Sequence, residues 1–124
     1  MSILSLNHVQ LGYPQALEAP VRCFYGEQLA LQPGIGPSGK GSRYRVGAQR
    51  IDLVPVEAHA LPQSPGHVAF EVLNLPELRH RLLSQGLNLD ETRPLPGHRR
   101  FYVQDPAGNT LEFLEPEPTG VWTV

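Results

Sequence analysis

Two histidines and two carboxylates recur at nearly equal spacing in the two halves of the chain. Asp52 follows His8 by 44 positions, and Glu112 follows His67 by 45. Imidazole nitrogens and carboxylate oxygens together suit a borderline divalent cation such as Zn, Ni, Fe, Mn or Co. If the four side chains converge, the pattern predicts a metal site with coordination positions left open for water or substrate.

Each of these side chains also has a simpler interpretation. A single histidine on a strand is often a polar residue on a solvated or hydrogen-bonded face. Glu112, with Glu115 and Glu117 close by, could belong to a charged surface near the C-terminus. The metal hypothesis therefore depends on the joint placement of the four groups and not on any one of them.

The segments around the four residues alternate between apolar and polar side chains, which is typical of strands. In HVAFEV (67–72), three apolar residues alternate with His67 and two others. Successive side chains of a strand point to opposite faces, so the apolar set should pack against helices. His8, Asp52 and Glu112 likewise stand next to large apolar residues. We expect all four groups on the sheet faces that turn away from the helices.

Thirteen prolines and twelve glycines divide the chain into short segments. In the first half, the patterns predict strands at 3–11, 42–46 and 50–56, a helix at 16–31 and a loop at 33–41. In the second half, they predict strands at 67–72, 87–92, 99–104 and 109–115, and a helix at 76–86. Each half thus consists of a strand, a helix and then two or three strands.

The two halves also match in sequence, which indicates a tandem repeat. His-Val occurs in the first strand of each half, and the matching segments are 43–46 with 100–103 and 51–53 with 111–113. A unit of about 55 residues gains a core by stacking on a second copy. We therefore predict an α+β fold in which two tandem βαβββ repeats, at about 3–57 and 66–115, form curved mixed sheets around a cavity within a single domain, 1–124.

Composition narrows the classes of function. Ten basic residues face twelve acidic ones, for a net charge of −2, which argues against a nucleic-acid-binding face. The single cysteine excludes an internal disulfide and suggests a reducing compartment. No apolar run approaches the roughly 18–20 residues of a membrane span, and the first residues do not resemble a signal peptide. We expect a cytoplasmic protein that does not associate with membranes.

Several motifs resemble a known superfamily. They are LNHVQL, PGHVAFEV and YVQDPAGNTLEFLEP, together with FYG at 24–26 followed by two leucines, which is similar to a first-helix pattern written FYxxxLGL. In these motifs the chain resembles the vicinal oxygen chelate superfamily, which includes glyoxalase I and the fosfomycin-resistance and bleomycin-resistance proteins. Extradiol ring-cleaving dioxygenases also belong to it. The resemblance covers residues 3–116.

The resemblance implies a ligand set. The metal ligands of the superfamily fall on His8, His67 and Glu112, and Glu112 is then the catalytic carboxylate. Asp52 occupies the place of a fourth ligand, a glutamate in glyoxalase I, and is one methylene shorter. Fosfomycin-resistance proteins and dioxygenases manage with two histidines and one glutamate. The bound metal would hold two adjacent substrate oxygens and stabilise an oxyanion or enolate-like intermediate as a Lewis acid.

Three further residues are candidates for contact with the substrate. Arg100 and Tyr102 share one strand face and could hold an anionic or hydroxylated molecule, although a surface arginine beside a rim tyrosine fits equally well. Glu71 follows His67 on the same face and could serve as a base.

The resemblance also implies a homodimer, in which His8 of one subunit meets His67 and Glu112 of the other. The segment 119–124, with Trp122, could cover the partner or close the cavity. The expected function is that of a metal-dependent glyoxalase-like enzyme that carries out lyase or isomerase chemistry on a small molecule with adjacent oxygens. The alternatives are a metal-free ligand-sequestering protein of the bleomycin-resistance type, a small dioxygenase, or a structural interaction domain.

Overall fold

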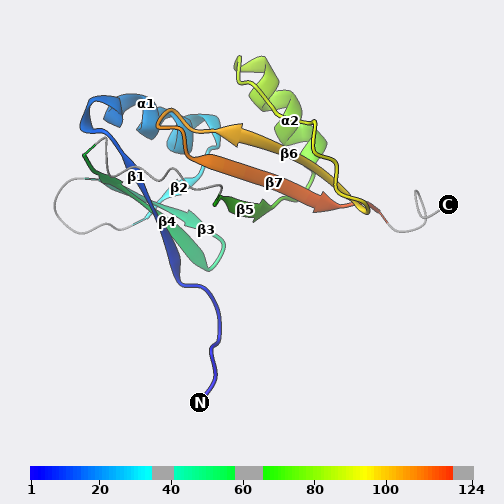
Figure 1. Cartoon of the computed structure of the whole chain (residues 1–124), viewed down its shortest axis with the longest axis horizontal. Coiled ribbons are helices and arrows are strands. Elements are labelled where there is room, and N and C mark those ends of the chain that lie inside the picture. The colour runs from blue at the N-terminus through cyan, green and yellow to red at the C-terminus, as the bar shows by residue number, and fades with distance from the viewer. Residues whose placement is uncertain (35–40, 58–65, 119–124) are drawn as a thin grey trace. The chain divides into compact units, whose positions relative to one another are not determined.

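The computed structural model describes residues 1–34, 41–57 and 66–118 (Figure 1). The C-terminal segment 119–124 and most of the expected loop at 33–41 lie outside the described residues. The chain divides into two units, Met1–Ser64 and Pro65–Val124, whose boundary falls between the two predicted repeats.

Unit 1 contains a mixed sheet of four strands. Its elements are β1 (His8–Tyr13), a helical run made of η1 (Gln15–Leu17), α1 (Glu18–Cys23) and η2 (Phe24–Gln28), then β2 (Gln32–Pro33), β3 (Ser42–Val46) and β4 (Gln49–Pro55). The strand order is β1-β4-β3-β2, with β1 parallel to β4 and the other pairs antiparallel. This is the predicted βαβββ order.

The helical run of unit 1 covers one face of the sheet. Val21, Phe24 and Tyr25 are buried, and the Tyr25 ring stacks on Tyr44 of β3 with 5.8 Å between centroids. The predicted helix at 16–31 ends earlier, at Gln28. A backbone bond from Leu29 N–H to the Phe24 carbonyl closes a wide last turn, and the left-handed backbone of the next residue (φ 56°) prevents the helix from continuing.

Unit 2 has the same kind of arrangement with three strands. Its elements are β5 (Val68–Glu71), α2 (Leu75–Ser84), β6 (His98–Gln104) and β7 (Thr110–Pro116). The strand β7 lies between β5 and β6, parallel to β5 and antiparallel to β6 (Figure 1). The apolar face of this sheet includes Phe101 and Phe113, whose ring centroids are 5.4 Å apart.

The helix α2 is attached to the sheet through its first turn. The carboxylate of Glu115, on β7, accepts hydrogen bonds from the backbone N–H groups of Asn74 (2.6 Å) and Leu75 (2.9 Å). The Asn74 side chain accepts a further bond from the Glu77 N–H, as an N-cap residue should. Leu75 and Leu82 are buried. Unit 2 therefore has a well-capped helix with its apolar side in the core.

Two strand starts and one entire strand differ from the predictions. The first strand begins at His8 instead of residue 3, and Ile3 and Leu4 are more than nine-tenths exposed. The fifth strand begins at Val68, so His67 immediately precedes it. The predicted strand at 87–92 is wrong: it is reduced to one bridge between Asp90 and Tyr102. The reason is local, because the Asp90 carboxylate accepts bonds from the Thr92 N–H (2.9 Å) and hydroxyl (2.6 Å) and turns the chain.

The strand register confirms the repeat and corrects one detail of it. Gln10 pairs with Asp52 and Ala69 with Glu112, so His8 and His67 each stand two residues before an equivalent position. The predicted match of 43–46 with 100–103 is displaced by two residues: Asp52 pairs with Arg43, whereas Glu112 pairs with Tyr102. The hairpin loops differ in length, and this shifts one strand against its partner.

The fold is therefore the predicted α+β arrangement of two repeats with curved mixed sheets, complete as βαβββ in unit 1, while in unit 2 a single bridge stands where the third of these strands was expected. Within the described ranges, no helix has the length and apolar character that crossing a bilayer requires.

Candidate functional site

The two predicted ligands of unit 2 lie in direct contact. His67 Nε2 is 2.7 Å from Glu112 Oε1. Glu112 is on the central strand β7 and only 6% exposed, so its charge needs partners. Ala69, its neighbour on β5, contributes only a methyl group, and His67 reaches Glu112 diagonally across that position. Unit 2 thus holds a histidine–carboxylate pair at a protected point of the sheet.

Two of the predicted substrate residues surround this pair. Arg100 Nη1 lies 3.4 Å from Glu112 Oε2, while its Nε and Nη2 donate to the backbone carbonyl of Arg93 at 2.9 and 2.6 Å. The ring of Tyr102 meets the His67 ring edge-on, with 5.3 Å between centroids. Most of the donors of Arg100 are therefore already used within the chain. The third candidate, Glu71, is exposed on the same face of β5 as His67.

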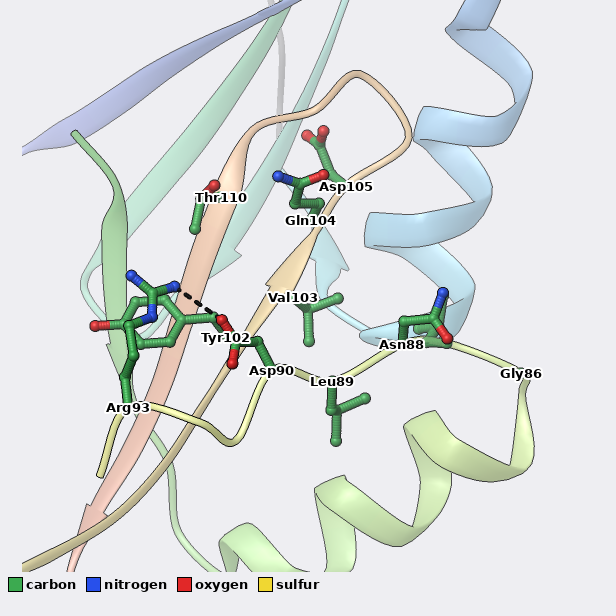
Figure 2. Close-up of a pocket in the computed structure, with 11 residues that line it drawn as sticks. Gly86, Asn88, Leu89, Asp90, Arg93, Tyr102, Val103, Gln104, Asp105 and Thr110 are labelled. Atoms are coloured by element: carbon green, nitrogen blue, oxygen red, sulfur yellow. Dashed lines mark hydrogen bonds and ion pairs between the residues drawn. The ribbon is translucent and has the colours of Figure 1, made fainter. Parts of the chain in front are cut away.

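The structure adds Arg93 and Asp90, which sequence reasoning missed. The Arg93 guanidinium lies 3.7 Å above the centre of the Tyr102 ring and is 3.2 Å from the Asp90 carboxylate (Figure 2). Hydrogen bonds from the hydroxyl and the N–H of Thr92 lower the pKa of Asp90. The sequence Asp90-x-Thr92 was an available sign of a turn at this place. Tyr102 is thus held from two sides, by Arg93 and by His67.

A cavity of about 510 Å³ runs along this side of β6 (Figure 2). Asp90, Arg93 and Tyr102 line it, together with residues of the segment that follows α2. A second cavity, of about 280 Å³, lies beside Arg99 and Arg100 near the start of α2. The larger cavity is within the range of small-molecule sites, roughly 300–1,000 Å³.

The equivalent pair in unit 1 is looser and has different neighbours. His8 Nε2 is 3.9 Å from Asp52 Oδ2. Arg50 forms a fork on Asp52, with Nε 2.9 Å from Oδ1 and Nη2 3.3 Å from Oδ2. Arg43 Nε is 3.3 Å from the same Oδ1. Both oxygens of this buried carboxylate are therefore engaged by guanidinium groups, in the geometry that arginine and carboxylate prefer.

Taken one at a time, His8, His67 and Glu112 have surroundings that are compatible with binding a divalent cation, whereas Asp52 does not. Two ligand atoms that each lie about 2.0–2.2 Å from a metal are roughly 3 Å apart, close to the separation of the His67 and Glu112 atoms. His8 engages its Nδ1 with Asn7 Oδ1 at 2.8 Å, which orients the ring and leaves Nε2 for a metal. Asp52 does not fit, because a metal would have to displace arginine from it.

Neither unit by itself, over residues 1–34, 41–57 and 66–118, gathers three histidine, cysteine, aspartate or glutamate side chains in a metal-binding arrangement. Each unit supplies one pair: His8 with Asp52, and His67 with Glu112.

Comparison with known proteins gives the family. No family model matches the sequence, and no curated protein matches it. Among solved structures, a glyoxalase family protein from Bacillus anthracis is 33% identical, covers 94% of this chain and 98% of its own, and superimposes with a TM-score of 0.85. An identity of this level over nearly the full length of both chains shows common family membership.

More distant structures share the fold alone. Lactoylglutathione lyase from Agrobacterium tumefaciens is 18% identical, covers 97% of both chains and has a TM-score of 0.73. An antibiotic binding protein from Streptomyces sp. CB03234 is 18% identical, covers 94% of this chain and 99% of its own, and has a TM-score of 0.76. The repeat, its register and the Bacillus relative lead to one conclusion: the chain belongs to the glyoxalase family of the vicinal oxygen chelate superfamily.

Proposed function

We propose that this protein is a metal-dependent enzyme of the glyoxalase type that acts on a small molecule with adjacent oxygens, by lyase or isomerase chemistry. The observation that carries the proposal is the contact between His67 and the buried Glu112. A nitrogen and an oxygen donor are held together there at nearly the separation that a shared cation requires. Family membership supports the same function.

The ligands in this proposal are His8, His67 and Glu112, a set of two histidines and one carboxylate. Such a set suits Zn, Ni, Fe, Mn or Co and leaves coordination positions for a substrate. When bound, the ion would polarise adjacent substrate oxygens and stabilise the negative charge that develops on them. Because neither unit holds all three ligands, we also propose a homodimer in which His8 of one copy joins the pair of the other, which sedimentation analysis would test.

The remaining residues of unit 2 have defined tasks in this proposal. Arg100 holds the second oxygen of Glu112 and so orients the carboxylate. Tyr102 packs against His67 and forms a wall of the larger cavity. Glu112 is the proposed catalytic carboxylate, and the exposed Glu71 on the same face is the proposed proton acceptor.

A second function is supported by a different observation. The cavity of about 510 Å³ is large enough for a small molecule, and one structural neighbour is an antibiotic binding protein. On this alternative, the protein sequesters a ligand without converting it, and the histidine–carboxylate pair, which does not line this cavity, is simply a hydrogen-bonded polar pair behind Tyr102. The two functions differ in whether a metal is bound.

The test is the metal content of protein purified without a metal-affinity tag. We expect roughly one divalent ion per chain in the wild type and its loss in His67→Ala. The matched control is His80→Ala, which removes an exposed histidine of α2 and should keep the metal. The loaded protein would then be screened for turnover of molecules with adjacent oxygens. A wild type that holds no metal, with a melting temperature unchanged by added divalent ions, would exclude the enzyme and favour sequestration.

A further inference from the structure

Three arginines lie on the sheet face of unit 1 that carries His8 and Asp52. Arg45 is paired with Arg50 across β3 and β4, and Arg50 is paired with His8 across β4 and β1. In the next row, Arg43 is opposite Asp52. Partners that lie directly opposite in a sheet project to the same face, so these side chains form one cluster, which we call the arginine face (Arg43, Arg45 and Arg50).

The arginine face carries more positive charge than its surroundings balance. Asp52 is the only acidic residue on this face of the four strands, and it already serves both Arg43 and Arg50. Arg45 is exposed, and in the part of the chain that the structure describes it has no acidic partner. Moreover, Arg45 and Arg50 stand directly opposite each other, an arrangement of like charges that destabilises a sheet. The cluster therefore has an excess of positive charge that an anion would relieve.

The cluster is also ordered for binding. Asp52 is buried and fixes the Arg50 guanidinium through two bonds, of 2.9 and 3.3 Å. The Arg43 and Arg50 side chains are only about a third exposed, at 28% and 33%. Arg50 also places its Nη1 3.4 Å from Asn7 Oδ1, so it contributes a fixed charge, and Arg45 supplies the planar fork that matches the oxygens of carboxylate or phosphate in a pair of parallel hydrogen bonds. Restricted motion before binding reduces the entropy that binding costs.

Unit 2 does not offer the same feature. Its equivalent face holds Arg100, but this guanidinium donates to the Arg93 carbonyl twice and approaches Glu112. The residue expected from the sequence to hold an anion is therefore largely occupied. On the His8 face of unit 1, by contrast, Arg45 has no acidic partner among the described residues.

We propose that the arginine face binds an oxyanionic group of the substrate, a carboxylate, phosphate or phosphonate. This names the substrate class of the enzyme proposed above, an anionic small molecule with adjacent oxygens, and in that respect it rests on the proposed function. The link is His8, a proposed metal ligand, which stands next to Arg50 in the same row. Anion binding itself requires no metal and can be measured separately.

The experiment titrates the chelator-treated full chain with inorganic phosphate and, separately, with oxalate, by calorimetry at constant ionic strength. We expect saturable binding of at least one anion by the wild type. Arg45→Gln should weaken it about tenfold or more, because one charge-assisted interaction is lost. The anion affinity of Arg45→Lys should fall between that of the wild type and that of Arg45→Gln, since lysine keeps the charge and loses the planar fork. Preference for phosphate or for oxalate identifies which oxyanion the face selects.

The control is Arg22→Gln, which removes the same charge from the helical run against the opposite face of this sheet. Its effect should stay within about twofold. Equal weakening by both variants would mean unspecific attraction and would overturn the proposal, as would the absence of saturable binding. His67→Ala should keep anion binding. If the wild type binds phosphate but no metal, the proposed enzyme function fails and the anion site stands. If it binds metal but neither anion, the anion site fails and the proposed enzyme function stands.

Discussion

The two units place a carboxylate at the same register position and use it differently. Asp52 and Glu112 are both buried on an interior strand of their sheet, and each follows a histidine at equivalent spacing. The residue opposite Asp52 is Arg43, and the residue opposite Glu112 is Tyr102. Arg43 and Arg50 together engage both oxygens of Asp52. Glu112 has one arginine, Arg100, on one oxygen and His67 on the other, so it has a candidate ligand as its nearest partner.

The largest expected difference between the two units is in the stability lost when the residue opposite each carboxylate is removed. Tyr102 is 7% exposed and lies between Arg93 and His67, so Tyr102→Ala should cost about 3 kcal/mol of unfolding free energy through the cavity that it leaves. Arg43→Ala should cost about 1 kcal/mol, because Asp52 keeps Arg50. Urea denaturation of metal-free protein measures both. Similar losses in the two variants would contradict the different roles assigned to these positions.

A smaller difference in stability is expected at the ends of β4 and β7, the interior strands of the two sheets. Glu115 of β7 corresponds to Pro55 of β4, which has no side-chain acceptor for a helix. Hydrogen bonds from the N–H groups of Leu75 and Asn74 lower the pKa of the Glu115 carboxyl. Because the pKa in the folded protein is below that in the unfolded chain, the contribution is complete above about pH 4.3 and is lost as the pH falls through the folded pKa.

Glu115→Gln should therefore lower the melting temperature modestly at neutral pH and reduce the loss of stability on acidification. Melting curves from neutral to acidic pH, with Glu117→Gln as a neighbouring control, measure this effect. If the variant and the wild type lose stability in acid in parallel, Glu115 does not secure the helix α2 through its charge.

The sequence predicted the sheet faces of the candidate residues better than it predicted the boundaries of the elements around them. Strand alternation is local, so the faces of His8, Asp52 and Glu112 could be predicted from their immediate neighbours. The repeat spacing then identified equivalent positions, which the register confirms. The fork of Arg50 on Asp52 also has a local sign in the sequence, because residues two apart on a strand share a face.

The missed features depend on contacts between distant segments. The equivalent positions of β3 and β6 differ by two residues from the predicted sequence match, because the two hairpin loops are unequal in length. One of these loops is closed by Asp105, whose carboxylate accepts hydrogen bonds from the N–H groups of Ala107 and Asn109 at 2.9 Å. The position of Arg93 over Tyr102 depends on how the chain turns after Asp90. Such placements need the folded partner, and alternation within one strand does not contain them.

The proposed function requires that Glu112 ligates a metal, and the two arginines on Asp52 predict that Asp52 does not. The direct measurement is the metal affinity of Glu112→Gln and Asp52→Asn, each purified without a metal-affinity tag and checked for folding by its far-UV circular dichroism. We predict that Glu112→Gln weakens binding by more than about a hundredfold, whereas Asp52→Asn changes it by less than about threefold. Loss of metal from Asp52→Asn to the same extent, or its retention by Glu112→Gln, would contradict the claim.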